Sequence, residues 1–227
     1  MAFYAKPSGG YATDSTEWTN NVYTIYNYLS AEGYTMECVS GMLGNMFAES
    51  GLNPWRWQNN VVNYSAGYGL MQFTPASGYI NLTGIPQHAP NLSTSQQTTG
   101  ASSDDGYAQL YVFIHDTLSK WYSPLWRSYW DQSAYPDLYN QARNVLIAYG
   151  NGSTLTMSQF AGITDVYSST LAFLGCYEGP AVPNYDTRLF YALHIYDVLG
   201  GYTPPGDNIL IELKILDVNR KRKFQNI

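Results

Sequence analysis

Glu49 is the residue of this chain whose type and spacing best suit it to do chemistry. It follows Met46 by three positions and Met42 by seven, so on a helix it projects from the face that turns toward the core. Apolar neighbours disfavour the charged form of a carboxylate, and such a group holds its proton near neutral pH. A proton donor of this kind is what cleavage of a glycosidic bond requires. The alternative interpretation is a carboxylate that ends a helix and reaches water or a structural ion pair.

A glycine-rich run, GYGLMQFTP, begins at Gly67 and places Gly69 20 residues after Glu49. Glycine lets a backbone turn sharply and pass close to a ligand, where a side chain would stand in the way. The run therefore predicts a turn that can approach a ligand.

The elements that must position these residues are mainly helices. An N-cap within residues 13–15 begins a helix that runs to about Ala31, and Thr35 caps a helix that ends near Glu49 or Ser50. Further helices are expected over about 104–119, 137–149, 158–162, 164–177 and 185–199.

Between these helices the sequence predicts turns and loops. Residues 51–80 carry turn signals and predict a small two- or three-stranded β element around 55–58 and 69–73. Residues 81–103 are rich in Asn, Ser, Thr, Gln and Gly, which is typical of a surface loop. An irregular aromatic stretch holds Trp121, Trp126 and Trp130.

Composition excludes several classes of function. Residues 1–200 carry 14 Asp and Glu against six Lys and Arg, which argues against a nucleic-acid groove because such a groove needs a basic stripe. No apolar stretch is long enough to cross a bilayer, and the first ten residues contain no apolar signal core. The 22 Tyr and 6 Trp suit either sugar rings or the core of a lightly charged virion-type protein.

Two other chemistries are less well supported. His88, His115 and His194 lie far apart without paired metal ligands, so no metal or other cofactor is expected. Cys38 lies in the first turn of a helix, where the dipole lowers the pKa of a thiol, and His115 or His194 could act as its base. Since apolar residues share that helix, Cys38 is better interpreted as a core residue. Cys38 and Cys176 are expected to be reduced and buried.

Four strings of residues resemble one protein family. The strings GMLGNMFAESGLNP, WQNN, GYGLMQFTPASGYIN and FLGCYEGP are similar to those of the bacteriophage tail lysozymes, the muramidase domains of tail knobs and tail tips. The similarity is greatest to tail-knob proteins of short-tailed phages that infect Gram-positive bacteria. The resemblance covers about residues 15–199 and implies a mainly α, lysozyme-like α+β fold with a small β element beside the cleft.

The resemblance also implies roles for particular residues. Glu49 would be the general acid, and Ser50 would orient it. Leu70 and Met71 would form part of the cleft wall, and Tyr79 could offer a stacking surface. The substrate-binding residues that the resemblance implies are Trp57, Gln58, Gly69, Gln72, Phe73, Thr74, Tyr177 and Glu178.

The second carboxylate of a glycosidase is not evident. No Asp or Glu follows Glu49 before Asp104, and Glu178, Asp165 and Asp186 are candidates only through the fold. A lytic transglycosylase needs one carboxylate, because that group first protonates the leaving oxygen and then deprotonates the muramyl 6-hydroxyl. Hydrolysis is favoured by the resemblance, and transglycosylation stays open. A non-catalytic tail knob or wall-binding protein is a third alternative, although such a protein has no need of a buried acid.

The expected organisation has four parts. They are an N-terminal arm at 1–11, a peptidoglycan-cleaving domain at 12–199, a Gly/Pro linker at 200–206, and a segment at 207–227 whose alternating residues predict a strand followed by a basic RKRK run. The resemblance implies a virion protein of the distal tail that acts on the host cell wall. Its expected partners are peptidoglycan glycan strands and other phage tail proteins, with an oligomeric arrangement in the virion left open.

Overall fold

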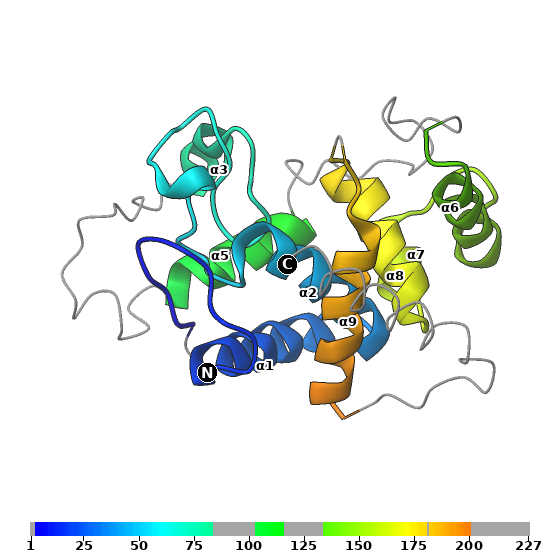
Figure 1. Ribbon diagram of the computed structural model, residues 1–227, viewed down its shortest axis with the longest axis horizontal. Helices are drawn as coiled ribbons and strands as arrows, with labels where there is room; N and C mark the ends of the chain where they lie inside the picture. The colour runs from blue at the N-terminus through cyan, green and yellow to red at the C-terminus, as the bar shows by residue number, and fades with distance from the viewer. Residues whose placement is uncertain (1–2, 84–102, 116–133, 181, 201–227) are drawn as a thin grey trace, which may run out of the picture.

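The computed structural model describes residues 3–83, 103–115, 134–180 and 182–200, and these residues are mainly helical (Figure 1). The Ser15 hydroxyl accepts a hydrogen bond from Trp18 N at the start of α1 (Thr16–Ala31). The Thr35 hydroxyl does the same for Cys38 N at the start of α2 (Met36–Ser50). Each cap satisfies a backbone N–H that the helix leaves without a partner. Both predicted helices are confirmed.

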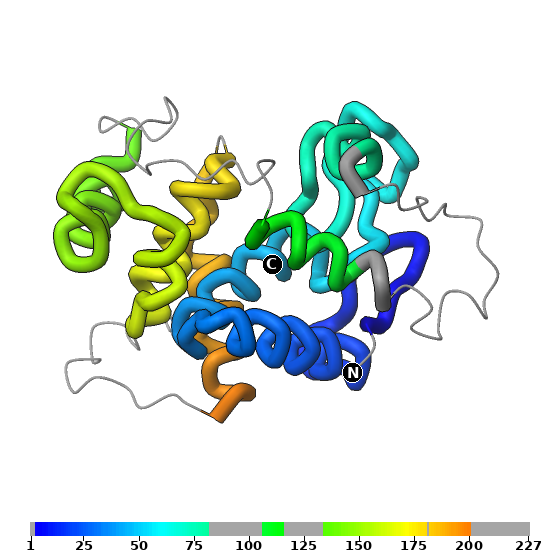
Figure 2. Tube along the Cα trace, turned by 180° about the vertical axis from the view of Figure 1, so that it is seen from behind, coloured from blue at the N-terminus to red at the C-terminus, as the bar shows by residue number. Residues whose placement is uncertain are grey.

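Helix α2 lies at the centre of the fold. It packs against α1, α8 (Val166–Phe173) and α9 (Tyr185–Val198), and both views show it between them (Figures 1 and 2). A Cβ added to Gly41 would lie 2.3 Å from Ser169 Oγ and 2.5 Å from Thr170 N. A Cβ added to Gly44 would lie 2.5 Å from Arg188 O. The two glycines therefore allow α2 to approach the backbones of α8 and α9.

The other helices extend or correct the expected pattern. The helix expected over about 137–149 begins at Pro136, whose missing N–H is not needed in the first turn. The helix predicted over 164–177 changes to a π-helical turn at Leu174, and a further helix forms within the stretch where turns and a loop were predicted. These remaining elements are η1 (Gln58–Asn60), α3 (Ala76–Thr83), α5 (Ser103–His115), α6 (Pro136–Tyr149), α7 (Met157–Ala161) and η2 (Leu174–Glu178).

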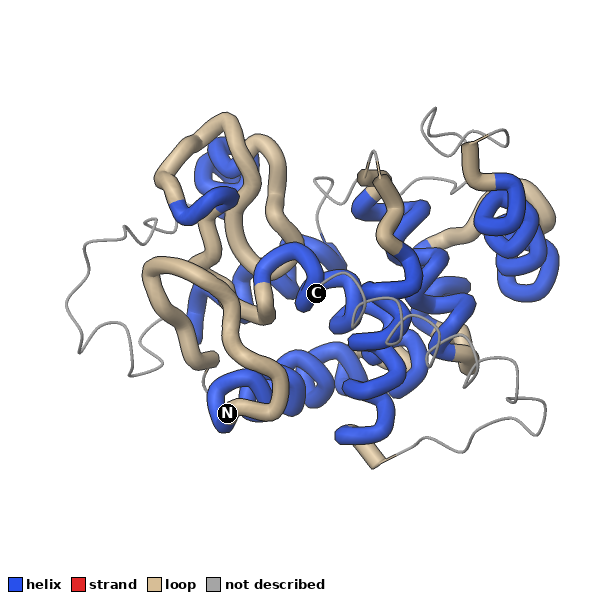
Figure 3. Tube along the Cα trace, viewed as in Figure 1, coloured by secondary structure: helices blue, strands red, loops and turns tan. Residues whose placement is uncertain are grey.

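The small β element is not confirmed. In the described part of residues 51–80 there is no strand, and Figure 3 shows loops over most of this region. Two isolated antiparallel bridges, between Trp57 and Tyr68 and between Tyr68 and Phe73, are all that the structure forms of it. Gly69 has φ 84° and Gln72 has φ 47°, so neither residue adopts the extended conformation that a ladder needs.

The N-terminal segment packs on the helices rather than standing clear of them. Phe3 is fully buried, and Tyr4 N donates to Asn21 Oδ1 at 2.8 Å. Asn21 Nδ2 donates in turn to Tyr4 O and to Leu52 O. The buried amide of Asn21 thus joins this segment to the end of α2. The boundaries 1–11 and 12–199 stay a prediction.

None of the helices in the described ranges is long and apolar enough to cross a membrane.

Several expectations lie outside the described residues. The predictions that fall elsewhere in the chain concern His88, most of the loop at 81–103, the tryptophans at 121–130, the linker at 201–206 and the segment 207–227.

Candidate active site

Glu49 lies in the last turn of α2, with its side chain 24% exposed. The Arg188 guanidinium of α9, only 5% exposed, donates through Nη2 to Glu49 Oε1. Helical spacing predicted apolar neighbours around the Glu49 carboxylate. On one side the structure places the buried Arg188 cation there instead. Sequence reasoning missed Arg188, because it lies 139 residues further along the chain.

Four contacts hold the Arg188 guanidinium in place. Besides Glu49, it donates to Pro183 O at 3.1 Å, Asn45 O at 3.4 Å and Asn45 Oδ1 at 3.3 Å. The Asn45 amide donates to Gly41 O at 2.8 Å and Thr170 O at 3.0 Å. A buried guanidinium is stable only when its donors are paired, and this network pairs them. One carboxylate oxygen of Glu49 is thus fixed by a rigid support.

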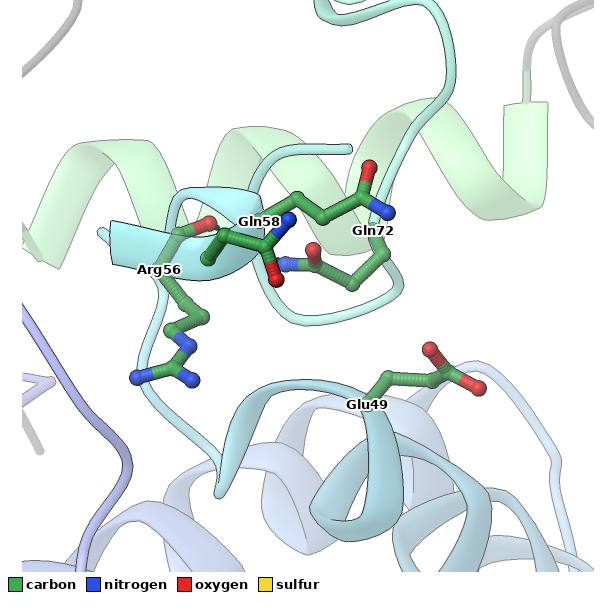
Figure 4. Close-up of a pocket in the computed structure, with 5 residues that line it drawn as sticks. Glu49, Arg56, Gln58 and Gln72 are labelled. Atoms are coloured by element: carbon green, nitrogen blue, oxygen red, sulfur yellow. Dashed lines mark hydrogen bonds between the residues drawn. The ribbon is translucent and has the colours of Figure 1, made fainter. Parts of the chain in front are cut away.

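A hollow of about 210 Å³ opens beside Glu49. Figure 4 shows Gln58 and Gln72 across from the end of α2, with Arg56 pointing away from the Glu49 carboxylate. Side-chain amides both donate and accept hydrogen bonds, as do the hydroxyl and acetamido groups of a sugar. The lining is therefore suited to a polar, uncharged ring beside an acid. The residues that line the hollow are Glu49, Arg56, Gln58, Asn59 and Gln72.

Backbone contacts set the position of both glutamines. Gln58 N donates to Gly67 O at 2.9 Å, and Gln58 Oε1 accepts from Gly67 N at 3.0 Å. Gln72 Nε2 donates to Arg56 O at 3.1 Å and Gly69 O at 3.0 Å. Gln72 has φ 47°, a left-handed conformation that costs a non-glycine residue about 1–3 kcal/mol.

Gly69 makes room for a side chain of the protein itself. A Cβ at this position would lie 2.3 Å from Gln109 Oε1. Gln109, fully buried on α5, accepts from Leu70 N at 2.7 Å and donates to Pro54 O at 2.8 Å. The close approach predicted for Gly69 is therefore made by Gln109. Sequence reasoning missed this glutamine, which no motif marks.

Ser50 joins the two motif segments. Its hydroxyl lies 2.9 Å from Met46 O and 2.9 Å from Leu70 O, and it can donate to either carbonyl. The link fixes the glycine-rich run against the end of α2. Both contacts are with backbone carbonyls and not with the Glu49 carboxylate, so the role of Ser50 in orienting Glu49 stays a prediction.

The aromatic candidates lie inside the protein. Trp57 is fully buried with its ring centroid 4.6 Å from that of Tyr68, and Phe73 stacks on Tyr79 at 4.9 Å. Thr74 is exposed, and its hydroxyl donates to Gln72 O at 2.9 Å. The geometry gives Trp57 and Phe73 a packing role. Sugar contacts from Trp57, Phe73 and Thr74 stay a prediction.

Tyr177 and Glu178 belong to η2 and are not among the residues that line the hollow. The Tyr177 ring stacks on Phe173 at 5.0 Å, and burial, with a smaller effect of Glu178, raises the pKa of its hydroxyl well above the usual value. Of the other acids, Asp165 caps α8 and Asp186 is exposed in the first turn of α9. Among the described residues, Glu49 is the one carboxylate that lines the hollow.

The thiol alternative fails on access and charge. Cys38 and Cys176 are buried and free, as expected. Burial, with a smaller effect of Glu37, raises the pKa of the Cys38 thiol well above its usual value, so the predicted lowering by the helix dipole is wrong. His194 Nε2 lies 2.8 Å from Asp14 Oδ1, and His115 Nε2 lies 3.9 Å from Glu32 Oε2.

Two comparisons with known proteins found similar sequences. Residues 20–199 match a family model described as phage tail lysozyme. The chain is also similar to Morphogenesis protein 1 of Bacillus phage B103, with 50% identity over 66 residues. That alignment covers 29% of this chain and 18% of the relative, so the chain aligns with less than a fifth of that protein.

Proposed function

This chain belongs to the phage tail lysozyme family, whose members are phage-associated peptidoglycan-degrading proteins, and we propose that it is a muramidase. It cleaves the β-1,4 bond between N-acetylmuramic acid and N-acetylglucosamine. Glu49 is the proton donor, and the amides of Gln58 and Gln72 bind the glycan. The observation that carries the proposal is the placement of Glu49, a part-exposed carboxylate on a rigid helix end in a hollow lined by amides.

The proposed reaction follows from the fixed oxygen of Glu49. Arg188 holds Oε1, and among the described residues Oε2 makes no hydrogen bond, so Oε2 is the oxygen that faces a substrate. Its proton passes to the bridging oxygen as the bond from that oxygen to C1 of the muramyl residue breaks. The strand that ends in N-acetylglucosamine leaves with that proton. Water then adds to C1 and gives up one proton to the Glu49 carboxylate, which restores the acid. General acid catalysis of this kind contributes about 10²–10⁴-fold in rate.

One observation favours a second reaction at the same site. Glu49 is the one acid that lines the hollow within the described ranges, whereas hydrolysis with inversion uses a second carboxylate as base. In a lytic transglycosylase, Glu49 would take back the proton from the muramyl 6-hydroxyl, whose oxygen attacks C1 to form a 1,6-anhydro ring.

Mass spectrometry of digested peptidoglycan separates these reactions. We expect reducing N-acetylmuramic acid ends from the wild-type protein and none from Glu49→Gln. Products with 1,6-anhydro ends would show that the enzyme is a lytic transglycosylase and not a hydrolase. Glu37→Gln is the matched control, because Glu37 lies in the first turn of the same helix and accepts from Tyr196 OH at 2.9 Å. A wild-type protein that binds wall without cleaving it would instead be a structural knob or wall-binding protein.

The proposed site of action is the distal tail of the virion. A muramidase there would open the wall locally so that the tail can deliver DNA, in contact with other tail proteins. Phage carrying Glu49→Gln should adsorb at the normal rate but deliver DNA late. Delivery at the wild-type rate would contradict this role.

A further inference from the structure

Positive charge is scarce in the described part of the chain and gathers near the hollow. The Lys and Arg side chains there are Lys6, Arg56, Arg143 and Arg188. Arg188 is buried against Glu49, and Arg143 is exposed on α6. Lys6 and Arg56 are neighbours, because a Cβ placed on Gly9 would lie 3.7 Å from Arg56 Nη1 and 4.0 Å from Lys6 Nζ. Lys6 and Arg56 thus lie near the same point of the surface, with Lys6 Nζ 4.6 Å from the centroid of the Tyr11 ring, and Arg56 lines one end of the hollow.

A hydrogen-bonded frame holds these two cations together. Asn53 Nδ2 donates to Lys6 O at 2.8 Å and Gly9 O at 2.7 Å, and Asn53 Oδ1 accepts from Lys6 N at 3.2 Å. Asn60 Oδ1 accepts from Arg56 Nη1 at 2.6 Å and from Gly9 N at 2.7 Å. The N-terminal segment thus brings Lys6 to Arg56 by specific contacts.

Within the described ranges, neither Lys6 nor Arg56 forms an ion pair with a carboxylate. The ion pairs found there join Glu49 to Arg188, while Glu32 and Asp14 each pair with a histidine. Neighbouring like charges repel each other, and the chain as a whole carries an excess of acids. An unbalanced cationic pair at the rim of a ligand site is suited to an anionic group of the ligand.

We propose that Lys6 and Arg56 form an anion-binding end of the hollow that takes a carboxylate or phosphate attached to the glycan strand. In peptidoglycan the carboxylates belong to the lactyl-peptide arm of N-acetylmuramic acid, and the phosphates belong to polymers attached to the wall. Arg56 points away from the Glu49 carboxylate (Figure 4), so the anion lies away from the bond that is cleaved. This assignment rests on the proposed function and adds a preference for muramyl glycans over uncharged N-acetylglucosamine polymers.

The first test compares Lys6→Gln, Arg56→Gln and the double variant with Arg143→Gln, which removes one positive charge from an exposed helix position. The substrate is peptidoglycan freed of phosphate polymers. We expect the apparent KM to rise about fivefold in the double variant and to stay unchanged in Arg143→Gln, with a smaller change in kcat. Added salt should reduce the difference, because it screens exposed charges. Equal apparent KM values for all proteins, on this wall and on wall that keeps its phosphate polymers, would overturn the proposal.

Two further substrates identify the anion. Wall whose carboxylates have been amidated should abolish the difference if carboxylates are bound. If phosphates are bound, the double variant should show a higher apparent KM than the wild-type protein on wall that retains its phosphate polymers.

Binding in a background without catalysis separates this proposal from the proposed function. Glu49→Gln and the triple variant with Lys6→Gln and Arg56→Gln are sedimented with wall, and the bound fraction is measured. Weaker binding by the triple variant supports the anion site even if the wild-type protein cleaves nothing. Equal binding overturns it even if Glu49 proves essential for cleavage.

Discussion

On the Glu49 side of the hollow, helices α2, α8 and α9 approach so closely that Gly41 and Gly44 stand at their contacts. On the opposite side, residues 51–75 form loops and the short η1, held by hydrogen bonds from both backbone and side chains. The helical side fixes the acid through packing and through its ion pair with the buried Arg188. The loop side fixes the proposed sugar-binding amides of Gln58 and Gln72 through bonds to backbone groups. Gln109 supports the same loops through Leu70 N and Pro54 O.

This difference assigns separate tasks to the two sides. A proton donor must be held within a fraction of an ångström of a reacting oxygen, and a packed helix end provides that rigidity. Sugar rings present hydroxyls in many directions, and irregular backbone can aim amides at them where a regular helix cannot. The two sides should therefore fail in different ways when altered.

The largest effect is expected from Arg188→Met. Loss of the guanidinium frees the Glu49 carboxylate to change rotamer, so kcat should fall about 10²-fold while KM changes little. Stability should also fall by about 3 kcal/mol, because a part-buried charge pair is broken. Steady-state kinetics and urea unfolding measure the two effects.

Arg188→Lys is the conservative variant for this test, and Arg143→Met is the matched control. A lysine keeps the charge but not the fork of donors, so it should recover part of kcat. Wild-type kcat in Arg188→Met would show that the ion pair does not position Glu49.

Gly41→Ala should weaken the helical side by packing alone. The new Cβ would meet the backbone of α8, and we expect a loss of about 3 kcal/mol in the free energy of unfolding despite the higher helix propensity of alanine. Gly162→Ala is the control, since the nearest atom to its Cβ is Gln159 O at 3.7 Å and its change should stay within about 0.5 kcal/mol. Equal stability of the two variants would contradict the close packing of α2.

Gln109→Leu tests the loop side. It removes the partners of Leu70 N and Pro54 O, and the expected loss of stability is about 2 kcal/mol. Because these bonds shape the amide lining, KM should rise more than kcat falls, which is the opposite of the Arg188→Met pattern. Gln141→Leu on the exposed face of α6 serves as the control. A kcat effect without a KM effect would break the division between the two sides.

The smallest effect is expected from thiol reagents. Burial raises the pKa of the Cys38 and Cys176 thiols, so both stay protonated at neutral pH, and alkylation requires the thiolate. The folded protein should keep its activity after iodoacetamide treatment, and mass spectrometry should find both thiols unmodified until denaturant is added. Loss of activity on alkylation of the folded protein would revive a cysteine mechanism.

Sequence reasoning was most successful where local chemistry decides the structure. An N-cap within residues 13–15 and a second at Thr35 follow from capping chemistry, and the structure confirms both, the first at Ser15. The family resemblance is also confirmed by the match over residues 20–199. Glu49 as the catalytic acid stays a prediction.

Contacts between distant residues could not be found in this way. Arg188, Gln109 and Asn45 occupy ordinary helical positions, and only the packing of α2, α5 and α9 shows what they bind. The β element failed for a related reason, because glycine and left-handed backbone in the 67–73 run limit pairing to single bridges. Trp57 and Phe73 illustrate that aromatic composition does not distinguish core from surface.

The ion pair between Glu49 and Arg188 also has a consequence for folding during synthesis on the ribosome. The two residues are 139 positions apart, so at about 5–20 residues per second the arginine is added roughly 7–28 s after the glutamate. Helix α2 emerges long before α8 and α9, the helices that bury it. The proton donor therefore acquires its support only when the C-terminal part of the domain has been translated, and nascent chains that stall before α9 should lack a working acid.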